Sequence, residues 1–250
     1  MSFTLVAFQE SQDTVGVLVP VASLTDQHIT QDGDDIYVPA WAPNVMAVFA
    51  LGATATDAKL TAPSMREGSE LQINPINVGA EPISNPRMVD MFDNPRPLNP
   101  SEGMRAYIAA GSGTTEYDTI LVWLGDTITP IPAGDIETIR FTATTTLVAQ
   151  TWTACDLTPD QQLRAGRYAV VGMKAISAGA VSARLIIPGS AYRPGVIAFD
   201  AVADCGEAKF RRGAVGVFGE FDHRFIPKAE FNSVSADTAE TVWLDLIYLG

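Results

Sequence analysis

The stretch Lys59-Leu60-Thr61-Ala62-Pro63 returns in a related form as Arg184-Leu185-Ile186-Ile187-Pro188. The two copies are separated by 188 − 63 = 125 residues, which is half of the 250-residue chain. A second pair has the same offset, 250 − 125 = 125: Leu121-Val122-Trp123-Leu124-Gly125 and Leu246-Ile247-Tyr248-Leu249-Gly250. Each copy is a short apolar run closed by Pro or Gly, as expected of a strand and its end. Two such pairs at one offset predict an internal duplication.

The rest of the chain also has the pattern of a β protein. Most segments between Gly, Pro, Asn and Asp are short and rich in β-branched or aromatic residues, which indicates strands. Helical spacing is almost absent, apart from one turn predicted at residues 158–163, with Pro159 at its first helical position. The predicted strands span residues 3–8, 14–19, 45–51, 58–61, 70–73, 87–92, 104–109, 117–124, 136–148, 167–176, 181–187, 196–201, 214–218, 221–226 and 241–249. Residues 136–148 are interpreted as either two strands or one bent strand.

The duplication and the strand count together predict the fold class. Each half offers the strand number of an eight-stranded jelly roll or a related sandwich. We therefore predict an all-β protein made of two tandem eight-stranded jelly-roll β-sandwiches, a double jelly roll. The first would span residues 1–126 and the second residues 135–250, with a proline-containing, semi-rigid linker at residues 127–134. A single β-sandwich of 250 residues is the structural alternative.

The composition argues against some partners. The net charge is −13, from 16 Lys and Arg against 29 Asp and Glu, and 47% of the residues are apolar. Non-specific affinity for nucleic acid comes from basic side chains that displace counterions, so direct nucleic-acid binding is not expected. The densest basic spot, Arg211-Arg212, is interpreted as solvated surface.

The sequence also favours one cellular compartment. The first ten residues lack the positive charges and the long apolar run of a secretory signal. The apolar run at residues 45–51 is far shorter than the roughly 20 residues of a membrane helix. Cys155 and Cys205 are too few for a disulfide framework, and two buried thiols are preferred, although a single bridge is left open. We expect folding in a reducing cytoplasm.

No catalytic constellation stands out in the sequence. A metal-dependent jelly-roll enzyme needs several imidazoles beside a carboxylate, and the chain has only His28 and His223. The turn Gly111-Ser112-Gly113-Thr114-Thr115 lacks the Gly-x-Ser-x-Gly pattern of a nucleophile elbow. Glu102 and Glu116 could serve as a glycosidase pair only if folding brought them together, and nothing singles them out. We predict no enzyme, and no catalytic, cofactor-binding or metal site.

Two further groups of residues have a functional and a structural interpretation. Asp32-Gly33-Asp34-Asp35 offers the carboxylates that calcium prefers, but it lacks the spacing of a dedicated calcium loop. A solvated acidic turn is the preferred interpretation, and a weak calcium site is left open. Trp41, Trp123, Trp152 and Trp243 lie in or beside predicted strands and are interpreted as core or interface packing rather than a platform for sugars.

Prolines concentrate in residues 75–100, where they prevent a regular strand ladder and predict a long, stiff connection. Long connections in compact domains are often functional. We therefore predict that this segment and the turn at residues 111–115 make contacts between subunits or between domains. A simple surface crossover is the alternative for residues 75–100.

With its two repeat pairs, its acidity and its few cysteines, the chain resembles the double jelly-roll major capsid proteins. That lineage spans adenovirus hexons and tailless, membrane-containing bacteriophages. The resemblance covers the whole chain at the level of architecture and rests on no signature motif. It implies two upright barrels per chain, pseudo-hexameric trimers, and an internal viral membrane behind the shell. It also implies contacts with other capsid proteins, such as penton or minor proteins, and a virion location after assembly in the host cytoplasm.

The primary functional hypothesis is a major capsid protein that self-assembles into an icosahedral viral shell. Two similar halves let a trimer fill a hexagonal lattice through related contacts. The alternative is a jelly-roll carbohydrate-binding module, lectin-like or part of a phage fibre, which needs an exposed aromatic or calcium-dependent site. A jelly-roll lyase or glycosidase is the weakest hypothesis, because the sequence offers no catalytic set.

Overall fold

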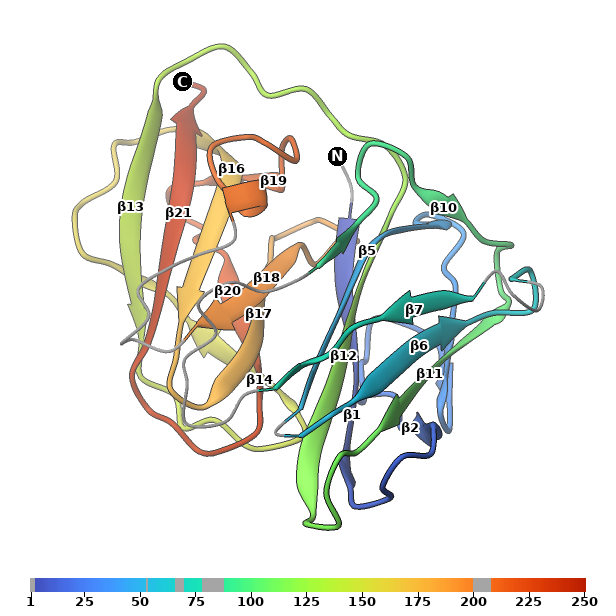
Figure 1. Ribbon diagram of the computed structural model, residues 1–250. Coiled ribbons are helices and arrows are strands. Elements are labelled where there is room, and N and C mark those ends of the chain that lie inside the picture. Colours follow the sequence, from blue (N-terminus) through green and yellow to red (C-terminus); the bar gives the residue numbers. More distant parts are fainter. Residues whose placement is uncertain (1–2, 53, 66–69, 78–87, 200–207) are drawn as a thin grey trace. The chain divides into compact units, whose positions relative to one another are not determined.

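The computed structural model describes residues 3–52, 54–65, 70–77, 88–199 and 208–250 (Figure 1). These residues form strands and one three-residue 3-10 helix, Ala208–Phe210, so the all-β prediction is confirmed. Contacts divide the chain into two compact units. We call residues 6–126 the N-terminal unit, and residues 1–5 together with 127–250 the C-terminal unit.

The first sheet of the N-terminal unit has the strand order β1-β12-β5-β10. Its long strands are rich in β-branched and aromatic residues and are buried over most of their length, as expected of strands that pack against a core. Two short strands also pair with β5, which are β8 in parallel and β9 in antiparallel orientation. The bounds are β1 (Phe3–Gln12), β5 (Asn44–Gly52), β8 (Ile76–Asn77), β9 (Val89–Asp90), β10 (Arg96–Pro97) and β12 (Glu116–Gly125).

The second sheet of the N-terminal unit has the order β3-β4-β11-β6-β7, with β2 also paired to β11. In β11 buried and half-buried residues alternate, which is the pattern of a strand with one face on the core. The bounds are β2 (Val19–Val21), β3 (Gln31–Asp32), β4 (Asp35–Tyr37), β6 (Asp57–Thr61), β7 (Leu71–Ile73) and β11 (Gly103–Ala109).

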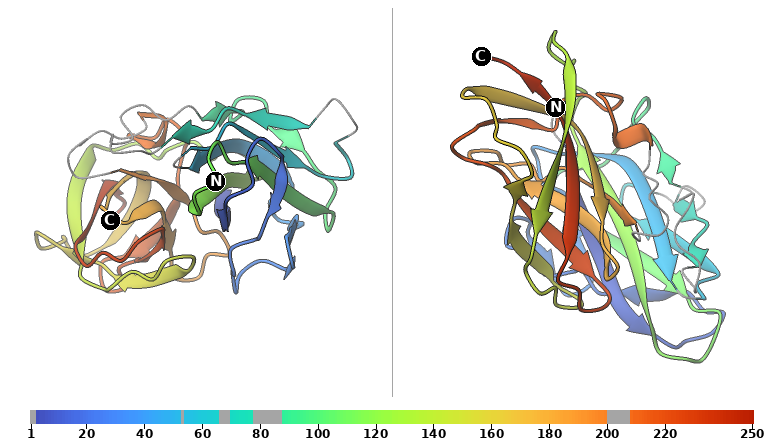
Figure 2. Two further views of the ribbon diagram at one scale, coloured as in Figure 1. Left: turned by 60° about the horizontal axis from the view of Figure 1, so that its bottom comes forward. Right: turned by 90° about the vertical axis from the view of Figure 1, so that its left-hand side faces the viewer.

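The C-terminal unit has the order β14-β20-β17-β18-β16-β21-β13-β15, and β19 pairs with β16 (Figures 1 and 2). Strand β18 connects two groups of strands, because it lies antiparallel to β17 and parallel to β16. The bounds are β13 (Ile136–Ala143), β14 (Trp152–Asp156), β15 (Thr158–Pro159), β16 (Arg167–Ile176), β17 (Ala180–Ile186), β18 (Gly195–Phe199), β19 (Gly219–Asp222), β20 (Lys228–Ser233) and β21 (Glu240–Tyr248).

The two units share one strand order. The series β1-β12-β5-β10 corresponds to β13-β21-β16-β19, and β11-β6-β7 corresponds to β20-β17-β18. The parallel pairing of β8 with β5 likewise corresponds to that of β18 with β16. The strands that hold the first repeat pair, β6 and β17, therefore occupy the same place in their units.

A β-bulge marks the same residue in both units. Val45 and Ala47 lie opposite Leu124 and Trp123, so Met46 has no partner across the ladder. Val170 and Gly172 lie opposite Leu246 and Asp245, so Val171 is skipped in the same way. The two bulged residues are 171 − 46 = 125 positions apart. Bulges are specific features of a fold, so this match supports a common design of the two units.

The bulge also shows that the residues of the second repeat pair, 121–125 and 246–250, are aligned incorrectly at an offset of 125. Leu124 of β12 corresponds to Leu246 of β21, an offset of 246 − 124 = 122 rather than 125. The strands correspond, but the sequence alignment of residues 121–125 with 246–250 is three positions out of register. Residues 120–124 and 244–247 are buried throughout and mostly apolar, so neighbouring registers of the two segments resemble one another in sequence.

The start of β1 is held by the C-terminal unit. Leu5 donates its backbone N–H to the Arg193 carbonyl at 2.9 Å, and the ring of Phe3 lies 4.9 Å from that of Phe218. The sequence prediction assigned all of residues 1–126 to one domain, whereas the contacts group residues 1–5 with residues 127–250. The predicted linker is packed as well, since Val217 donates its backbone N–H to the carbonyl of Thr129.

Several local predictions are wrong. Residues 214–215 belong to a turn and residues 216–218 have no regular secondary structure. Residues 14–17 contribute only an isolated bridge at Val15, and the strand expected at 136–148 ends at Ala143. The expected helical turn at Thr158-Pro159 is instead a short strand paired with β13. The proline-rich segment at residues 75–100 contains three short strands, β8, β9 and β10, each paired with β5. Residues 78–87 of this segment lie outside the described part of the chain.

Candidate functional site

A pocket of about 440 Å³ lies at the surface of the N-terminal unit, around Trp41. Its buried floor contains Ile29 and Val38, and its walls are half-buried aromatic side chains. Exposed residues with small side chains complete the rim. The lining residues are His28, Ile29, Thr30, Tyr37, Val38, Pro39, Ala40, Trp41 and Ser101.

Local hydrogen bonds fix the loop that carries His28. The Asp26 carboxylate accepts the backbone N–H of His28 at 2.9 Å, which is the geometry of an Asx-turn. Gln31 closes the same loop, because its amide oxygen accepts the N–H of Asp26 and its amide nitrogen donates to the Leu24 carbonyl. The His28 ring stands edge-on to Trp41, with centroids 6.1 Å apart.

The opposite side of the pocket is held by backbone pairing. Val38 donates its N–H to the Glu102 carbonyl, and Ser101 donates its N–H to the Val38 carbonyl at 2.8 Å. Ser101 adopts φ of 66°, a left-handed conformation that is uncommon for residues other than glycine. The sequence named His28 and Trp41 separately, and only the fold brings them together with Tyr37.

One carboxylate of the acidic turn at residues 32–35, that of Asp35, is paired with a cation. Asp35 accepts two hydrogen bonds from the Arg105 guanidinium, at 2.7 and 2.9 Å. This ion pair raises the pKa of Arg105 above its already high ordinary value. Within the described ranges, no group of three or more His, Cys, Asp or Glu side chains is arranged to hold a metal ion.

The two histidines considered for catalysis belong to different units, and Glu102 is engaged in local hydrogen bonds. His28 belongs to the N-terminal unit and His223 to the C-terminal unit, where its Nδ1 lies 3.0 Å from the backbone nitrogen of Gly166. Glu102 accepts hydrogen bonds from the backbone and hydroxyl of Ser64 and from the backbone of Asn99. The side chain of Glu116 lies outside the described residues.

The turn at residues 111–115 makes contacts within its own unit. The Thr54 hydroxyl donates to Ser112 Oγ at 3.3 Å, and a Cβ at Gly111 would lie 2.2 Å from the Thr54 carbonyl oxygen. Contacts of this turn between subunits stay a prediction. Cys155 is buried, and burial raises the pKa of its thiol, while Cys205 lies outside the described residues.

A buried ion cluster in the C-terminal unit was missed by the sequence interpretation. Arg184 donates from Nε to Glu230 at 2.7 Å and from Nη1 to the Leu5 carbonyl at 2.9 Å. Arg193 donates to both Glu230 oxygens, and the Arg184 guanidinium lies 3.9 Å from the ring centroid of Trp152. Lys59, which corresponds to Arg184 in the first copy of the repeat, also lies over an aromatic ring, that of Tyr107. No sequence signal distinguishes these charges from surface ones.

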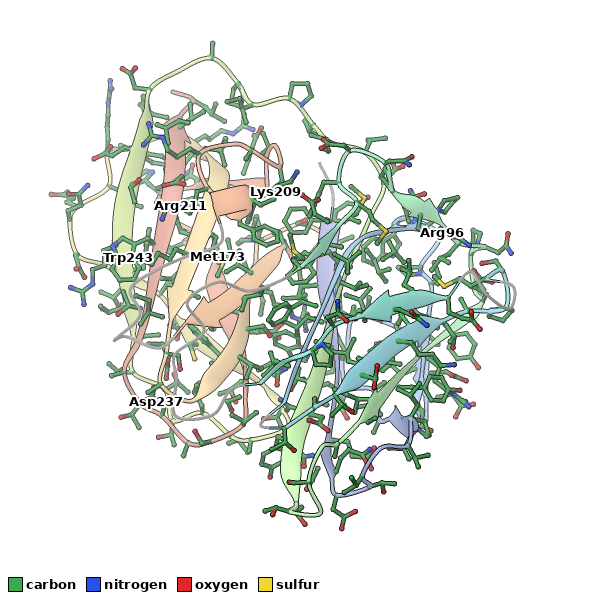
Figure 3. The ribbon with its side chains drawn as sticks, viewed as in Figure 1. Arg96, Met173, Lys209, Arg211, Asp237 and Trp243 are labelled. Atoms are coloured by element: carbon green, nitrogen blue, oxygen red, sulfur yellow. The ribbon has the colours of Figure 1, made fainter. Side chains whose placement is uncertain are left out.

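A second ion cluster corrects the interpretation of Arg211 as solvated surface. Arg211, labelled in Figure 3, donates two hydrogen bonds of 2.8 Å to Asp245, whose side chain is fully buried. Asp245 lies opposite Gly172, next to the bulge of β16. Burial opposes ionisation of Asp245, but hydrogen bonds from Arg211, Thr138 and the Arg212 backbone outweigh it and lower the pKa of the carboxyl. Arg211 therefore neutralises a core charge.

The other tryptophans do not form a common surface. Trp123 is fully buried, whereas Trp243 is half-buried between the cations of Arg140 and Lys174. Among the described residues, large apolar side chains are exposed in both units, and the most exposed of these is Phe225 at 62%. The others are Val15, Val17, Leu18, Ile128, Ile131, Val148 and Leu249.

Within the described residues, no helix has the length and apolar character needed to cross a membrane. No protein-family model matches the chain, and no curated protein sequence matches it. Among solved structures, the chain is similar to the major capsid protein P2 from bacteriophage PM2, with 8% sequence identity and a TM-score of 0.24 over 98% of both chains.

Proposed function

We propose that the chain is a structural protein, a major capsid protein that self-assembles as pseudo-hexameric trimers into the icosahedral shell of a virus. The observation that carries this proposal is the common strand order of the two units, with its bulge at Met46 and at Val171. A duplicated, non-identical sandwich is useful to a protein that must present related surfaces in one lattice.

The strand order supports the finer assignment of each unit as an eight-stranded jelly roll. Eight principal strands fall into β1-β12-β5-β10 and β4-β11-β6-β7 in the N-terminal unit. The corresponding sets in the C-terminal unit are β13-β21-β16-β19 and β14-β20-β17-β18. Along the chain, successive strands alternate between the two sets, apart from the neighbours β6–β7 and β17–β18. Such alternation is typical of the two Greek keys of a jelly roll.

Symmetry supplies the reason for a trimer. Three copies of a two-sandwich chain present six similar sandwiches, so a three-fold assembly can occupy a six-fold position in a lattice. The net charge of −13 disfavours direct contact with nucleic acid and agrees with a shell whose genome lies behind another layer, such as an internal membrane. Other capsid proteins, such as penton or minor proteins, would complete the virion.

The experiment is a measurement of mass against concentration on the purified full chain, by size-exclusion chromatography with light scattering. It uses about 0.15 M salt, where the Debye length of about 8 Å screens repulsion between acidic copies. We expect a species of three times 26.7 kDa, and sheets or shells in negative-stain images of concentrated protein. A monomer at every concentration up to the solubility limit contradicts the proposal.

A further inference from the structure

We infer that the pocket around Trp41 is a binding site for a neutral sugar ring. This inference goes beyond assembly, because it concerns a small ligand bound within the N-terminal unit alone. The pocket volume of about 440 Å³ lies within the range of roughly 300–1,000 Å³ that is usual for small-molecule sites.

The pocket combines the two kinds of surface that a sugar ring requires. A sugar has C–H groups that pack on an aromatic face and hydroxyl groups that need hydrogen-bond partners. Trp41 and Tyr37 supply half-buried aromatic walls, and each also has a polar group at its tip. Thr30 and Ser101 place hydroxyl groups at the exposed rim, where they can meet the hydroxyls of a ligand.

The charge of the surroundings decides which sugars fit. No Lys, Arg, Asp or Glu is among the nine lining residues, so no ion pair selects a charged ligand. Acidic residues lie near in sequence at Asp26, Asp32 and Asp34, and the whole chain carries −13. This field repels phosphates, nucleotides and sialylated glycans. Neutral hexoses and N-acetylhexosamines remain as the favoured class.

The site is also fixed before a ligand arrives. The Asp26 and Gln31 hydrogen bonds hold the loop of His28, and the edge-on imidazole limits the positions of the Trp41 ring. Ser101 keeps its left-handed φ of 66° through the pairing of its N–H with Val38. Strained residues of this kind concentrate at functional sites. A fixed site reduces the entropy that weak ligands must overcome.

The test uses the folded full chain and ligand-observed NMR with glucose, galactose, mannose, N-acetylglucosamine and their disaccharides. Sialyllactose serves as the anionic comparison. We expect at least one neutral sugar to bind saturably with a dissociation constant of about 1 mM, and sialyllactose to bind less tightly than lactose. The absence of saturable binding by every neutral sugar, or a preference for sialyllactose, overturns the inference.

Variants assign the binding to this pocket. Trp41→Ala should weaken binding at least about tenfold, and Trp41→Phe less, because an aromatic face remains. Ser101→Gly should weaken binding several-fold and keep or raise the melting temperature, because glycine tolerates positive φ. Trp243→Phe, in the other unit, is the control and should leave binding unchanged. Full binding by folded Trp41→Ala contradicts the assignment. The oligomeric state of the same samples tests the capsid proposal separately.

Discussion

Arg184 and Glu230 form an ion pair of 2.7 Å between neighbouring strands β17 and β20, and their side chains are only 1% and 9% exposed. Charges this deeply buried are stable only when each is compensated. Arg193 completes the set from the other side of Glu230, and the Leu5 carbonyl accepts a hydrogen bond from Arg184. The cluster therefore ties the start of β1 to the strands of its own unit.

Replacing one member of this cluster should be costly. Arg184→Met leaves the buried Glu230 carboxylate with one cation fewer, and we expect a loss of about 3–5 kcal/mol in the free energy of unfolding. Urea denaturation measures it. The control is Lys228→Met, which breaks an exposed pair between Lys228 of β20 and Asp156 of β14 and should cost less than about 1 kcal/mol. Equal losses in the two variants would show that burial does not govern the energy of the Arg184 pair.

Gly172 is required by the bulge. A Cβ at this position would lie 2.4 Å from Asp245 Oδ2 and 2.8 Å from the backbone nitrogen of Arg212. Neither neighbour can move freely, because Arg211 and Arg212 hold the carboxylate. Gly172→Ala should lower the free energy of unfolding by about 1–3 kcal/mol, measured by thermal or urea unfolding.

Gly113→Ala is the matched control, since a Cβ there meets nothing within 4 Å. Its stability should stay within about 0.5 kcal/mol of the parent. A loss at Gly172 that is no larger than the loss at Gly113 would mean that the bulge tolerates a methyl group.

The sequence predicted the long apolar strands well and the charged ones poorly. Strands β5, β16 and β21 read as apolar runs and were found almost to their ends. Strand β20 was missed because its sequence, KAEFNS, contains charged and polar residues that look exposed. Glu230 is buried only because Arg184 and Arg193 arrive from other segments, and that tertiary effect leaves no local pattern.

The candidate pocket illustrates the same limit. His28, Tyr37 and Trp41 are visible in the sequence as aromatic residues near polar turns. Their convergence depends on the loop closure by Gln31 and on the backbone pairing of Ser101 with Val38. Spacing along the chain does not reveal either contact. Residues 59–63 and 184–188 were enough to predict an internal repeat from the sequence. The residue-by-residue correspondence between β12 and β21 could be assigned only from the positions of the bulges.

Glu240 makes stability depend on pH. Burial raises the pKa of its carboxyl from 4.5 to about 7; the Ser177 hydroxyl opposes this rise and the Asp237 carboxylate adds to it. Between these values the folded protein keeps a proton that the unfolded chain has lost, so stability falls as pH rises from about 4.5 to 7. Above pH 7 the full loss in the free energy of unfolding is up to roughly 3 kcal/mol.

Glu240→Gln should remove this dependence. We expect the variant to be more stable than the parent at pH 8, and the difference to vanish near pH 4.5, as measured by urea unfolding at both values. Asp135→Asn, which removes an exposed carboxylate from the same unit, is measured alongside as the control for the loss of one charge. A stability difference for Glu240→Gln that is the same at both pH values would contradict the role of burial.

Phe225 is the strongest candidate for a contact between copies, a prediction that depends on the proposed assembly. Phe225 is 62% exposed, and hydrogen bonds hold the turn that presents it. The Phe225 N–H donates to the Asp222 carbonyl, and Arg224 forms two hydrogen bonds with the Asp222 carboxylate, which lower the pKa of that carboxyl. A large aromatic side chain fixed at a surface is typical of an interface hot spot.

Phe225→Ser should therefore weaken self-association at least about tenfold, corresponding to about 1.4 kcal/mol, and leave the unfolding of the monomer almost unchanged. Light scattering over a concentration series gives the association constant, and circular dichroism gives the stability. Asp135→Asn, which alters an exposed side chain of the same unit by charge alone, should not weaken association, because it removes repulsion between acidic copies. Unchanged association of Phe225→Ser would exclude this side chain from the interface.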